Sequence, residues 1–377
     1  MPDRITRAQI NLANYKHNLL WIRQTIGEDV ALMAVVKANA YGHGLEQVSL
    51  AAASVGVNYL GVATIGELKR IRKAGVVTPI LLLGYIDSDS IADALEHNAT
   101  ITVMDGAFVE ALNEIAETKD RIVKVHLKVD TGMHRAGCDL EDAVQLVEQI
   151  STCSNLELEG TYTHFAESET ANSDFTSDQL AKFTNYLERL DQKGLRPKLI
   201  HCANSAATIA LHETHFTMVR PGLITYGLNP FTIGHSNYDA AATNLRPVLF
   251  LESRVVLTRT IEAGESVGYN RRWTASRRSQ LALIPIGYGD GWRRSPSNAG
   301  RVIIHGQYAP IVGSVSMDQT VVDVTDISDV KVGDTVTLIG KDEPVGITVD
   351  DVAAMYNTIN YEVVVSLNER ITRNYTD

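Results

Sequence analysis

Short apolar runs alternate with amphipathic stretches through the first two thirds of the chain, and this alternation constrains the fold more than any other feature. The amphipathic stretches, such as residues 141–150 and 177–194, have the apolar spacing of helices, and Gly194 is a natural helix stop. Strands that alternate with helices pair in parallel through crossover connections. Eight such units build a (β/α)₈ barrel, although an open doubly wound sheet has the same alternation. The apolar runs are 31–37, 59–64, 80–84, 100–103, 123–130, 158–165, 199–205 and 217–222.

Polar residues at the downstream ends of these runs favour the closed barrel. In barrel enzymes the active site is built from the C-terminal ends of the strands. Any strand end that reaches solvent becomes polar, and this plainer explanation suits one or two of the runs better than six. The residues are Lys37, Thr64, Asp130 with Arg135, His164, Asn204 with Ser205, and Arg220.

The residue composition and the hydrophobic pattern of the sequence change after about residue 240. Segments rich in Val, Ile and Thr, bounded by Gly, Asp and Pro, indicate strands with short turns. We therefore predict an N-terminal (β/α)₈ TIM-like barrel over residues 1–240 and a C-terminal, mainly β domain over residues 241–377. One helical pattern, at 348–359, falls in the second domain. A chain of 377 residues is long enough for two domains.

Charge and cysteine usage narrow the class of protein. The formal net charge is -11, which argues against nucleic acid or an anionic membrane as a partner. No stretch is long and apolar enough to span a bilayer, and the first ten residues carry no apolar signal segment. The chain has three cysteines, an odd number, and they lack metal-ligand spacing: Cys138, Cys153 and Cys202. We expect reduced thiols, no metal site and a cytoplasmic location.

The stretch AVVKANAYGHG, residues 34–44, ends an apolar run on Lys37. A lysine at a strand end usually just reaches solvent. The sharper alternative is a lysine whose pKa is lowered so that its amine can form a Schiff base. Tyr41 follows in the same loop, where it either covers the barrel rim or donates its hydroxyl to an anion. Gly42 and Gly44 would let the backbone approach a ligand closely.

The last two runs carry the segments HCANSAA (201–207) and VRPGLITYG (219–227). Barrel enzymes often bind phosphate with the loops after their last two strands. Ser205 falls at a predicted helix N-terminus, where it can act as a simple N-cap, hold phosphate, or do both. Gly222 can offer its N–H without obstruction by a side chain. Arg220 lies between these phosphate candidates, which makes a plain surface ion pair the less attractive explanation.

Two further strand ends carry charged or titratable groups. Strand periodicity places Lys128 and Asp130 on one face, with Arg135 in the loop that follows. A structural ion-pair network explains this cluster as well as a functional site does. His164 is open to three roles: a general acid or base, a hydrogen-bond relay, and a satisfied core histidine.

The predicted β domain has polar and aromatic motifs whose tyrosines have an ordinary explanation, an interface or half-buried packing. VGYNRRW places Tyr269 in a basic turn next to a glycine, and GYGDG places Tyr288 in a glycine-rich loop. Met317 and Asp318 fall at a strand boundary in SVSMDQT. The GYGDG segment lacks the strand–helix context of a dinucleotide fingerprint.

Together these motifs resemble the alanine racemase family, whose members depend on pyridoxal 5′-phosphate. The match covers nearly the whole chain. The first motif is shared with other barrel-type pyridoxal enzymes and with related binding proteins, whereas the β-domain motifs distinguish the racemases. The matching segments are AVVKANAYGHG, KVDTGMHRAG, THFAES, HCANSAA, VRPG, VGYN, GYGDG, SMDQT and INYEV (359–363).

The resemblance implies a homodimer with composite active sites, in which a lysine and a tyrosine act on opposite faces of a small amino acid substrate. Lys37 would tether the cofactor and serve as one base, and Tyr269 of the partner subunit would be the other. Arg220 would face the pyridine nitrogen, and His164 would hydrogen-bond the catalytic tyrosine. The other implied cofactor-binding residues, most of them around the phosphate, are Tyr41, Asn204, Ser205, Gly222, Leu223 and Tyr361.

The resemblance also implies how the substrate is received. Arg135 and the backbone of Met317 would bind its carboxylate, while Tyr288 and Asp318 would line the entrance. In some members the lysine that corresponds to Lys128 is carbamylated and steadies the arginine that corresponds to Arg135.

The implied function is an isomerase that interconverts L-alanine and D-alanine and supplies D-alanine for peptidoglycan. A serine racemase or a broad-specificity racemase of the same family is the main alternative. A barrel-type decarboxylase usually places a carboxylate where Arg220 stands here. A non-catalytic pyridoxal phosphate carrier resembles the barrel alone and lacks the β-domain motifs.

Overall fold

The computed structural model describes residues 5–295 and 297–377, which form two compact units. The barrel unit comprises Asn14–Ala40 and Leu45–Arg246. The β unit comprises Pro247–Asp377 together with Tyr41–Gly44 and a first segment that ends at Ala13. This division differs from the predicted one at residue 240, because the chain enters and leaves the β unit before it completes the barrel.

Eight parallel strands form the core of the barrel unit in the order β8-β7-β6-β5-β4-β3-β2-β9. The two edges meet at β8 and β9, where the backbone N–H groups of Thr217 and Arg220 donate to the carbonyl oxygens of Ile200 (3.2 Å) and Ala203 (2.9 Å). The predicted barrel is therefore confirmed. Its strands are β2 (Ala31–Val35), β3 (Tyr59–Val62), β4 (Ile80–Leu82), β5 (Ala99–Val103), β6 (Val123–Lys128), β7 (Leu156–Tyr162), β8 (Leu199–His201) and β9 (Met218–Val219).

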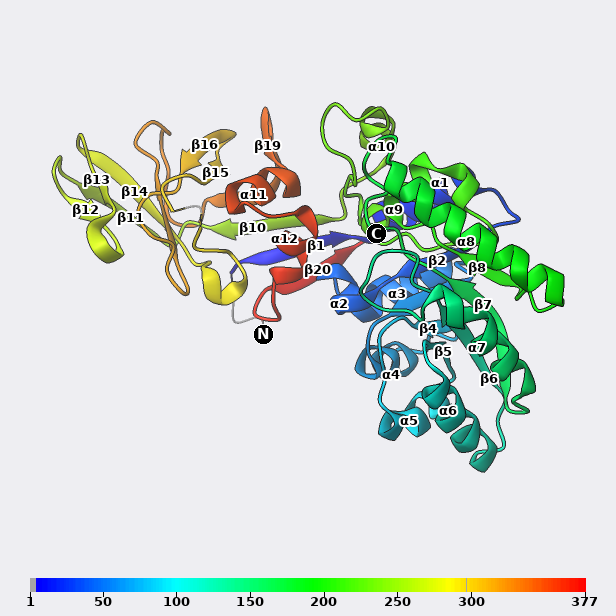
Figure 1. The fold of residues 1–377 in the computed structure, drawn as a ribbon. Helices are drawn as coiled ribbons and strands as arrows, with labels where there is room; N and C mark the ends of the chain where they lie inside the picture. The colour runs from blue at the N-terminus through cyan, green and yellow to red at the C-terminus, as the bar shows by residue number, and fades with distance from the viewer. Residues whose placement is uncertain (1–4, 296) are drawn as a thin grey trace. The chain divides into compact units, whose positions relative to one another are not determined.

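Helices follow the strands and lie on the outer side of the barrel (Figure 1). Their ends have local causes: Thr64 and Glu67 form a capping box that starts α4, and α8 stops at Gly194 with φ of 68°. Thr64 is thus a helix cap rather than a site residue. The helices are α1 (Leu12–Ile26), α3 (Leu45–Ser54), α4 (Ile65–Lys73), α5 (Ile91–Glu96), α6 (Gly106–Thr118), α7 (Leu140–Thr152), α8 (Asp174–Lys193), α9 (Ser205–Ala210) and α10 (Tyr238–Asn244).

The β unit is built on a seven-stranded sheet whose main order is β16-β15-β18-β10-β1-β20, with β19 paired to β18. The N-terminal strand β1 lies inside this sheet because its apolar residues alternate and are buried, and it pairs with both β10 and β20. A three-stranded sheet (β11-β14-β17) and the hairpin β12-β13 complete the strands. The bounds are β1 (Arg7–Asn11), β10 (Leu249–Arg254), β11 (Leu257–Ile261), β12 (Ser266–Val267), β13 (Trp273–Thr274), β14 (Ser279–Ile284), β15 (Arg301–Ile304), β16 (Gln307–Pro310), β17 (Thr320–Asp323), β18 (Thr335–Asp342), β19 (Val345–Ile347) and β20 (Thr372–Thr376).

Two helices belong to the β unit. The helix predicted at 348–359 is α11 (Val349–Tyr356), and a second helix, α12 (Asn360–Ser366), follows it without having been predicted. Within the described residues, no helix has the length and apolar character needed to cross a membrane.

Candidate active site

Lys37, two residues after the end of β2, begins a turn whose backbone is left-handed. The next three residues, Ala38, Asn39 and Ala40, have φ values of 54°, 55° and 53°, and Tyr41 follows with 52°. None of them is glycine, and the left-handed conformation costs roughly 1–2 kcal/mol for each such residue. Strain of this kind persists where the surrounding structure enforces it, which is typical of functional sites. The observed backbone therefore singles out Lys37 independently of its residue type.

Side chains of the barrel unit hold this turn in place. The backbone N–H of Asn39 donates to Glu67 Oε1 (3.3 Å), and the Asn39 Oδ1 accepts from the N–H of Leu45 (3.1 Å) and from Arg70 Nη2 (3.1 Å). Asparagine tolerates the left-handed region better than most residues. Glu67 also accepts from the N–H of Ala63 (2.9 Å), so one carboxylate ties the turn to the start of α4.

The Lys37 amine has a lowered pKa. Burial is the main cause, the positive charge of Arg135 adds to it, and Glu67 opposes it. A lowered pKa raises the fraction of neutral, nucleophilic amine at neutral pH. Lys37 does not simply reach solvent, and its environment suits Schiff-base chemistry.

Arg220 directly follows β9 and is buried, with 5 % of its surface exposed. Its Nη1 donates to His201 Nδ1 (2.9 Å), and its Nη2 donates to the carbonyl oxygen of Thr163 (2.8 Å) and to His164 Nδ1 (3.1 Å). The guanidinium also lies over the ring of Tyr162, 5.0 Å from the centroid. These partners are all neutral, so the surface ion pair considered from the sequence is wrong for Arg220.

Both histidines beside Arg220 are acceptors. An arginine only donates hydrogen bonds, so the nitrogen that faces it must carry a lone pair. Burial, reinforced by the charge of Arg220, lowers the pKa of His164 and of His201 well below the ordinary value. His164 is therefore neutral and accepts from Arg220 at Nδ1, an arrangement that suits a hydrogen-bond relay.

Ser205 and Gly222 form part of a donor cradle at the same end of the barrel. The Ser205 Oγ accepts from the N–H of Gly222 (3.0 Å) and from the N–H of Ile224 (3.4 Å). A hydroxyl and two nearby backbone amides that converge in this way suit an anion such as phosphate. Leu223, between the two amides, starts the 3₁₀ turn η3 (Leu223–Tyr226).

The N-cap prediction for Ser205 is wrong, because Asn204 caps α9. The Asn204 Oδ1 accepts from the N–H of Ala207 (3.1 Å) and from the Ser168 hydroxyl (2.8 Å). Asparagine is at least as good a cap as serine, and the cap falls one residue earlier than expected. The Ser205 hydroxyl is thereby left to the cradle.

Lys128, at the end of β6, is 9 % exposed. Burial, followed by the charges of Arg220, Arg135 and Lys37, lowers its pKa to about 8. The Asp130 carboxylate accepts from the backbone N–H groups of Gly132 (2.8 Å) and Arg135 (3.2 Å). Asp130 therefore orders the loop that carries Arg135, and the site has a strongly cationic character.

The remaining predicted site residues belong to the β unit. The rings of Tyr41 and Tyr361 lie 6.2 Å apart. The loop of Tyr288 packs against the segment of Met317, where the N–H of Gly289 donates to the Met317 carbonyl oxygen (2.8 Å). A Cβ on Gly287 would lie 2.2 Å from the carbonyl oxygen of Ser316. The glycines of GYGDG therefore permit a close backbone approach, which explains that motif without a nucleotide.

Asp318 is held by a residue that the sequence did not point to. Arg370 pairs with Asp318 and also with the buried Asp290, whose Oδ1 lies 3.2 Å from the Arg370 Nε. Arg370 thus joins the segment of Met317 to the GYGDG loop.

Tyr269 lies in the turn between β12 and β13 and is 69 % exposed. The turn needs unusual backbone angles, with φ of 70° at Gly268 and 60° at Asn270. Of the two ordinary explanations for this tyrosine, half-buried packing is wrong and an interface stays open. An exposed tyrosine on a structured turn is well suited to an interface. Tyr288 and Met317 are also exposed, at 44 % and 53 %.

Sequence reasoning missed the polar interior of the barrel. Tyr162, His126, Glu159 and His201 are all buried there. The signal was present in the run VKVHLKVD, where Lys124, His126 and Lys128 repeat every second residue of a predicted barrel strand.

The fold and the site define a class of protein: a (β/α)₈ barrel with a β unit, in which a lysine of lowered pKa, a cationic cluster and an anion cradle gather at the C-terminal ends of the strands. The family model for the alanine racemase N-terminal domain matches residues 10–230, and the model for the alanine racemase C-terminal domain matches residues 248–375. The chain belongs to the alanine racemase family, as its motifs predicted.

Individual relatives agree with this assignment. Alanine racemase 2 of Caldanaerobacter subterraneus subsp. tengcongensis is 39% identical, over 99% of this chain and 95% of that protein. The alanine racemase of Desulforamulus reducens is 40% identical, over 98% of both chains. Among solved structures, the alanine racemase of Clostridium difficile 630 superimposes with a TM-score of 0.92 at 33% identity, over 99% of this chain and 96% of that chain. The same relative has also been solved in complex with cycloserine.

Proposed function

We propose that this chain is a pyridoxal phosphate-dependent alanine racemase that acts as a homodimer with composite active sites. The observation that carries the proposal is Lys37, a lysine of lowered pKa on a strained turn at the C-terminal end of a barrel strand. The family supplies the activity, and the site supplies residues that fit the cofactor.

The residues of the barrel unit fit pyridoxal phosphate in three respects. The Lys37 amine can bond the aldehyde carbon, the Ser205 hydroxyl with the amides of Gly222 and Ile224 can hold the phosphate, and Arg220 can donate to the pyridine nitrogen. Asn204 and Leu223 frame the cradle. The resemblance to the family adds Tyr41 and Tyr361, whose rings lie 6.2 Å apart within the β unit. When bound, the cofactor acidifies the Cα–H bond of an amino acid joined to its aldehyde carbon.

Inversion needs a proton removed from one face of Cα and another returned to the opposite face. Lys37 serves one face, where its lowered pKa leaves neutral amine to accept the proton. Tyr269 of the partner subunit serves the other face, and the exposure of this residue on its own chain supports that role. His164 uses one nitrogen for Arg220, and its other nitrogen can steady the tyrosine hydroxyl.

Arg220 accounts for the side reactions that the site is expected to suppress. It donates but hardly releases a proton, so it would hold the ring nitrogen of a bound cofactor as an acceptor without protonating it. That would limit the withdrawal of electrons and disfavour side reactions such as transamination. Arg135 and the backbone of Met317 receive the substrate carboxylate, with Tyr288 and Asp318 at the entrance.

The alternatives are weaker for specific reasons. A decarboxylase of this fold usually has a carboxylate at the position that the buried Arg220 occupies here. A non-catalytic carrier has no use for a C-terminal domain of racemase type, which this chain carries over residues 248–375. A serine or broad-specificity racemase shares every feature named above, so substrate choice rests on the relatives, one of which binds the small amino acid mimic cycloserine.

The proposal includes a place and a purpose for the reaction. We place it in the cytoplasm, because Cys138, Cys153 and Cys202 are free thiols, as a reducing compartment keeps them. Its product, D-alanine, serves peptidoglycan synthesis.

The test of the function is to incubate the purified protein and pyridoxal phosphate with each L-amino acid and to separate the enantiomers by chiral chromatography. We expect D-alanine to form fastest, and D-alanine to yield L-alanine in the reverse direction. Faster formation of D-serine would make the chain a serine racemase, and the absence of any D-amino acid would refute the racemase assignment.

Lys128 is expected to be carbamylated and to brace Arg135. A pKa of about 8 leaves part of the amine neutral at pH 7.5 and able to react with carbon dioxide, and the resulting anion suits the cations around it. In a Lys128→Ala variant we expect activity to fall about tenfold and to be partly restored by acetate. Wild-type enzyme in the same acetate is the control. Electron density that shows an unmodified Lys128 amine turned away from Arg135 would contradict this prediction.

A further inference from the structure

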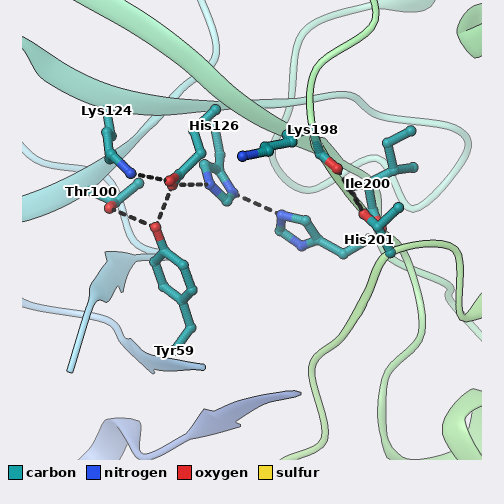
Figure 2. A network of polar contacts seen from close by, with 9 residues as sticks. Tyr59, Thr100, Lys124, His126, Lys198, Ile200 and His201 are labelled. Atoms are coloured by element: carbon teal, nitrogen blue, oxygen red, sulfur yellow. Dashed lines mark hydrogen bonds and ion pairs between the residues drawn. The ribbon is translucent and has the colours of Figure 1, made fainter. Parts of the chain in front are cut away.

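A continuous hydrogen-bonded chain crosses the interior of the barrel and ends on Arg220. His126, which is fully buried on β6, lies between Glu159 of β7 and His201 of β8. Its Nε2 is 3.2 Å from Glu159 Oε2, and its Nδ1 is 2.8 Å from His201 Nε2. His201 Nδ1 then accepts from Arg220 Nη1 at 2.9 Å. Figure 2 shows the two imidazoles of His126 and His201 pointing toward one another inside the barrel.

The local backbone is built around this arrangement. The pairing of β6 with β7 shifts by one residue between Val125 and His126, so that Glu159 is the extra residue of a bulge. Bulges re-aim side chains, and here Glu159 is buried while Glu157, two residues earlier, is exposed. The next residue, Gly160, lacks a Cβ that would otherwise lie 2.7 Å from the His126 ring. The bulge and the glycine together make room for the Glu159–His126 contact.

The hydrogen bonds of this chain can be donated in one direction only, from Arg220 toward Glu159. Arg220 can only donate, so His201 accepts at Nδ1 and, as a neutral ring, carries its proton on Nε2. That proton is donated to His126 Nδ1, so His126 in turn carries its proton on Nε2 and donates it to Glu159. Reversing any of these bonds would bring two donors together.

The chain ends on a charged carboxylate. Burial raises the pKa of Glu159, but the hydrogen bonds from His126, Lys124 and Tyr59 outweigh it and bring the pKa to about 2. Lys124 is half-exposed, and the Tyr59 hydroxyl is also 3.4 Å from Thr100 Oγ1. Figure 2 shows Lys124, Tyr59 and Thr100 gathered at this end of the chain.

The near surroundings of Arg220 include cations. In addition to burial, its charge lowers the pKa of Lys37 and of Lys128, as does that of Arg135, while Asp130 accepts from backbone N–H groups. A buried guanidinium is costly without compensating charge. Glu159 is connected to it through two polarisable imidazoles.

We propose that Glu159 is a positioning residue for Arg220: as the acceptor at the opposite end of the chain, its carboxylate holds His126 and His201 in the tautomers that Arg220 requires, so that His201 keeps presenting a bare nitrogen that orients the guanidinium. This inference rests on the proposed function only in its kinetic test, which uses the rate of racemisation to report on Arg220. A purely structural role for Glu159, as the partner of Lys124 and Tyr59, would leave the tautomers and the turnover of the folded enzyme unchanged on substitution.

Two variants and a matched control separate these roles. Glu159→Gln keeps an acceptor for His126 and removes the charge, whereas Glu159→Leu removes the acceptor. Glu157→Gln makes the same charge change on the exposed face of the same strand. Circular dichroism and thermal melting establish that each variant is folded, and Glu159→Gln serves if Glu159→Leu does not fold.

The first measurement is the ¹⁵N spectrum of the histidine-labelled holoenzyme, with His126 and His201 assigned through His126→Asn and His201→Asn. We expect both rings to be neutral and protonated on Nε2 in the wild type and in Glu157→Gln, and the His201 pattern to change in Glu159→Leu. A wild-type His201 that is protonated on Nδ1, or on both nitrogens, would overturn the proposal.

The second measurement is the kinetics of L-alanine racemisation. We expect kcat to fall about tenfold or more in Glu159→Leu and less in Glu159→Gln, with KM changed by no more than about twofold and Glu157→Gln unaffected. A folded Glu159→Leu enzyme with wild-type kcat would also overturn the proposal. If the wild type racemises nothing, the proposed function fails, and the tautomer change alone decides the role of Glu159.

Discussion

Replacing Lys37 with Ala is expected to reduce alanine racemisation by roughly a thousandfold or more, because the residue is both the tether of the cofactor and one of the two bases. The strained turn after β2 and the lowered pKa of the amine both point to this residue. The fold should survive, since the turn is held by Asn39 and Glu67 rather than by the lysine side chain. The measurement is kcat in both directions on folded variant enzyme reconstituted with pyridoxal phosphate.

Lys73→Ala is the matched control, because Lys73 is an exposed lysine at the end of α4 in the same barrel unit. It should retain wild-type activity. A Lys37→Ala enzyme with more than about a tenth of wild-type kcat would show that another residue does the chemistry.

Mixing two inactive variants is expected to restore activity. If each site takes Lys37 from one chain and the partner's Tyr269, then Lys37→Ala and Tyr269→Phe lie in the same site of a mixed dimer. The other site of that dimer is then fully native. With random pairing about half the dimers are mixed, so co-expression should recover roughly a quarter of wild-type activity. Tyr269→Phe alone should lower kcat by about 10²–10⁴-fold, which is the usual range for losing a general acid or base.

Two differently tagged chains make this test quantitative. Tandem purification isolates the mixed dimer, which should have about half of wild-type activity if its two sites are independent. If both residues came from one chain, every site would carry one lesion and nothing would recover. Activity no higher than that of either variant alone would therefore exclude Tyr269 as the base across the interface.

The barrel was predictable because its signal is repetitive. Each apolar run with its downstream helix repeats the same strand–helix pattern. The polar residues at the strand ends are consistent with one shared end of the barrel. Lys37, Arg220 and Ser205 were found because they stand at the downstream ends of such runs. The position of β1 was not predictable in the same way, since its pairing with β10 and β20 joins residues more than 230 positions apart.

The local geometry of the site could not be predicted from the sequence, because it depends on tertiary contacts and on one-residue shifts. Ala38, Asn39 and Ala40 are ordinary residues for a right-handed helix or a loop, and only the tertiary contacts of Asn39 and Glu67 impose the opposite hand. Glu159 enters the barrel through a one-residue bulge, which reverses the burial that strand alternation assigns. The capping of α9 by Asn204 rather than Ser205 is the same kind of one-residue shift.

The most direct measurement of the central claim is chemical reduction of the purified enzyme after incubation with pyridoxal phosphate. Borohydride should abolish the visible absorption of the bound cofactor and fix a pyridoxyl group on one peptide. Digestion and mass spectrometry should place that group on Lys37, and the Lys37→Ala enzyme should yield no corresponding adduct. A pyridoxyl group on a different lysine of the wild-type enzyme, or none at all after reconstitution, would contradict the account.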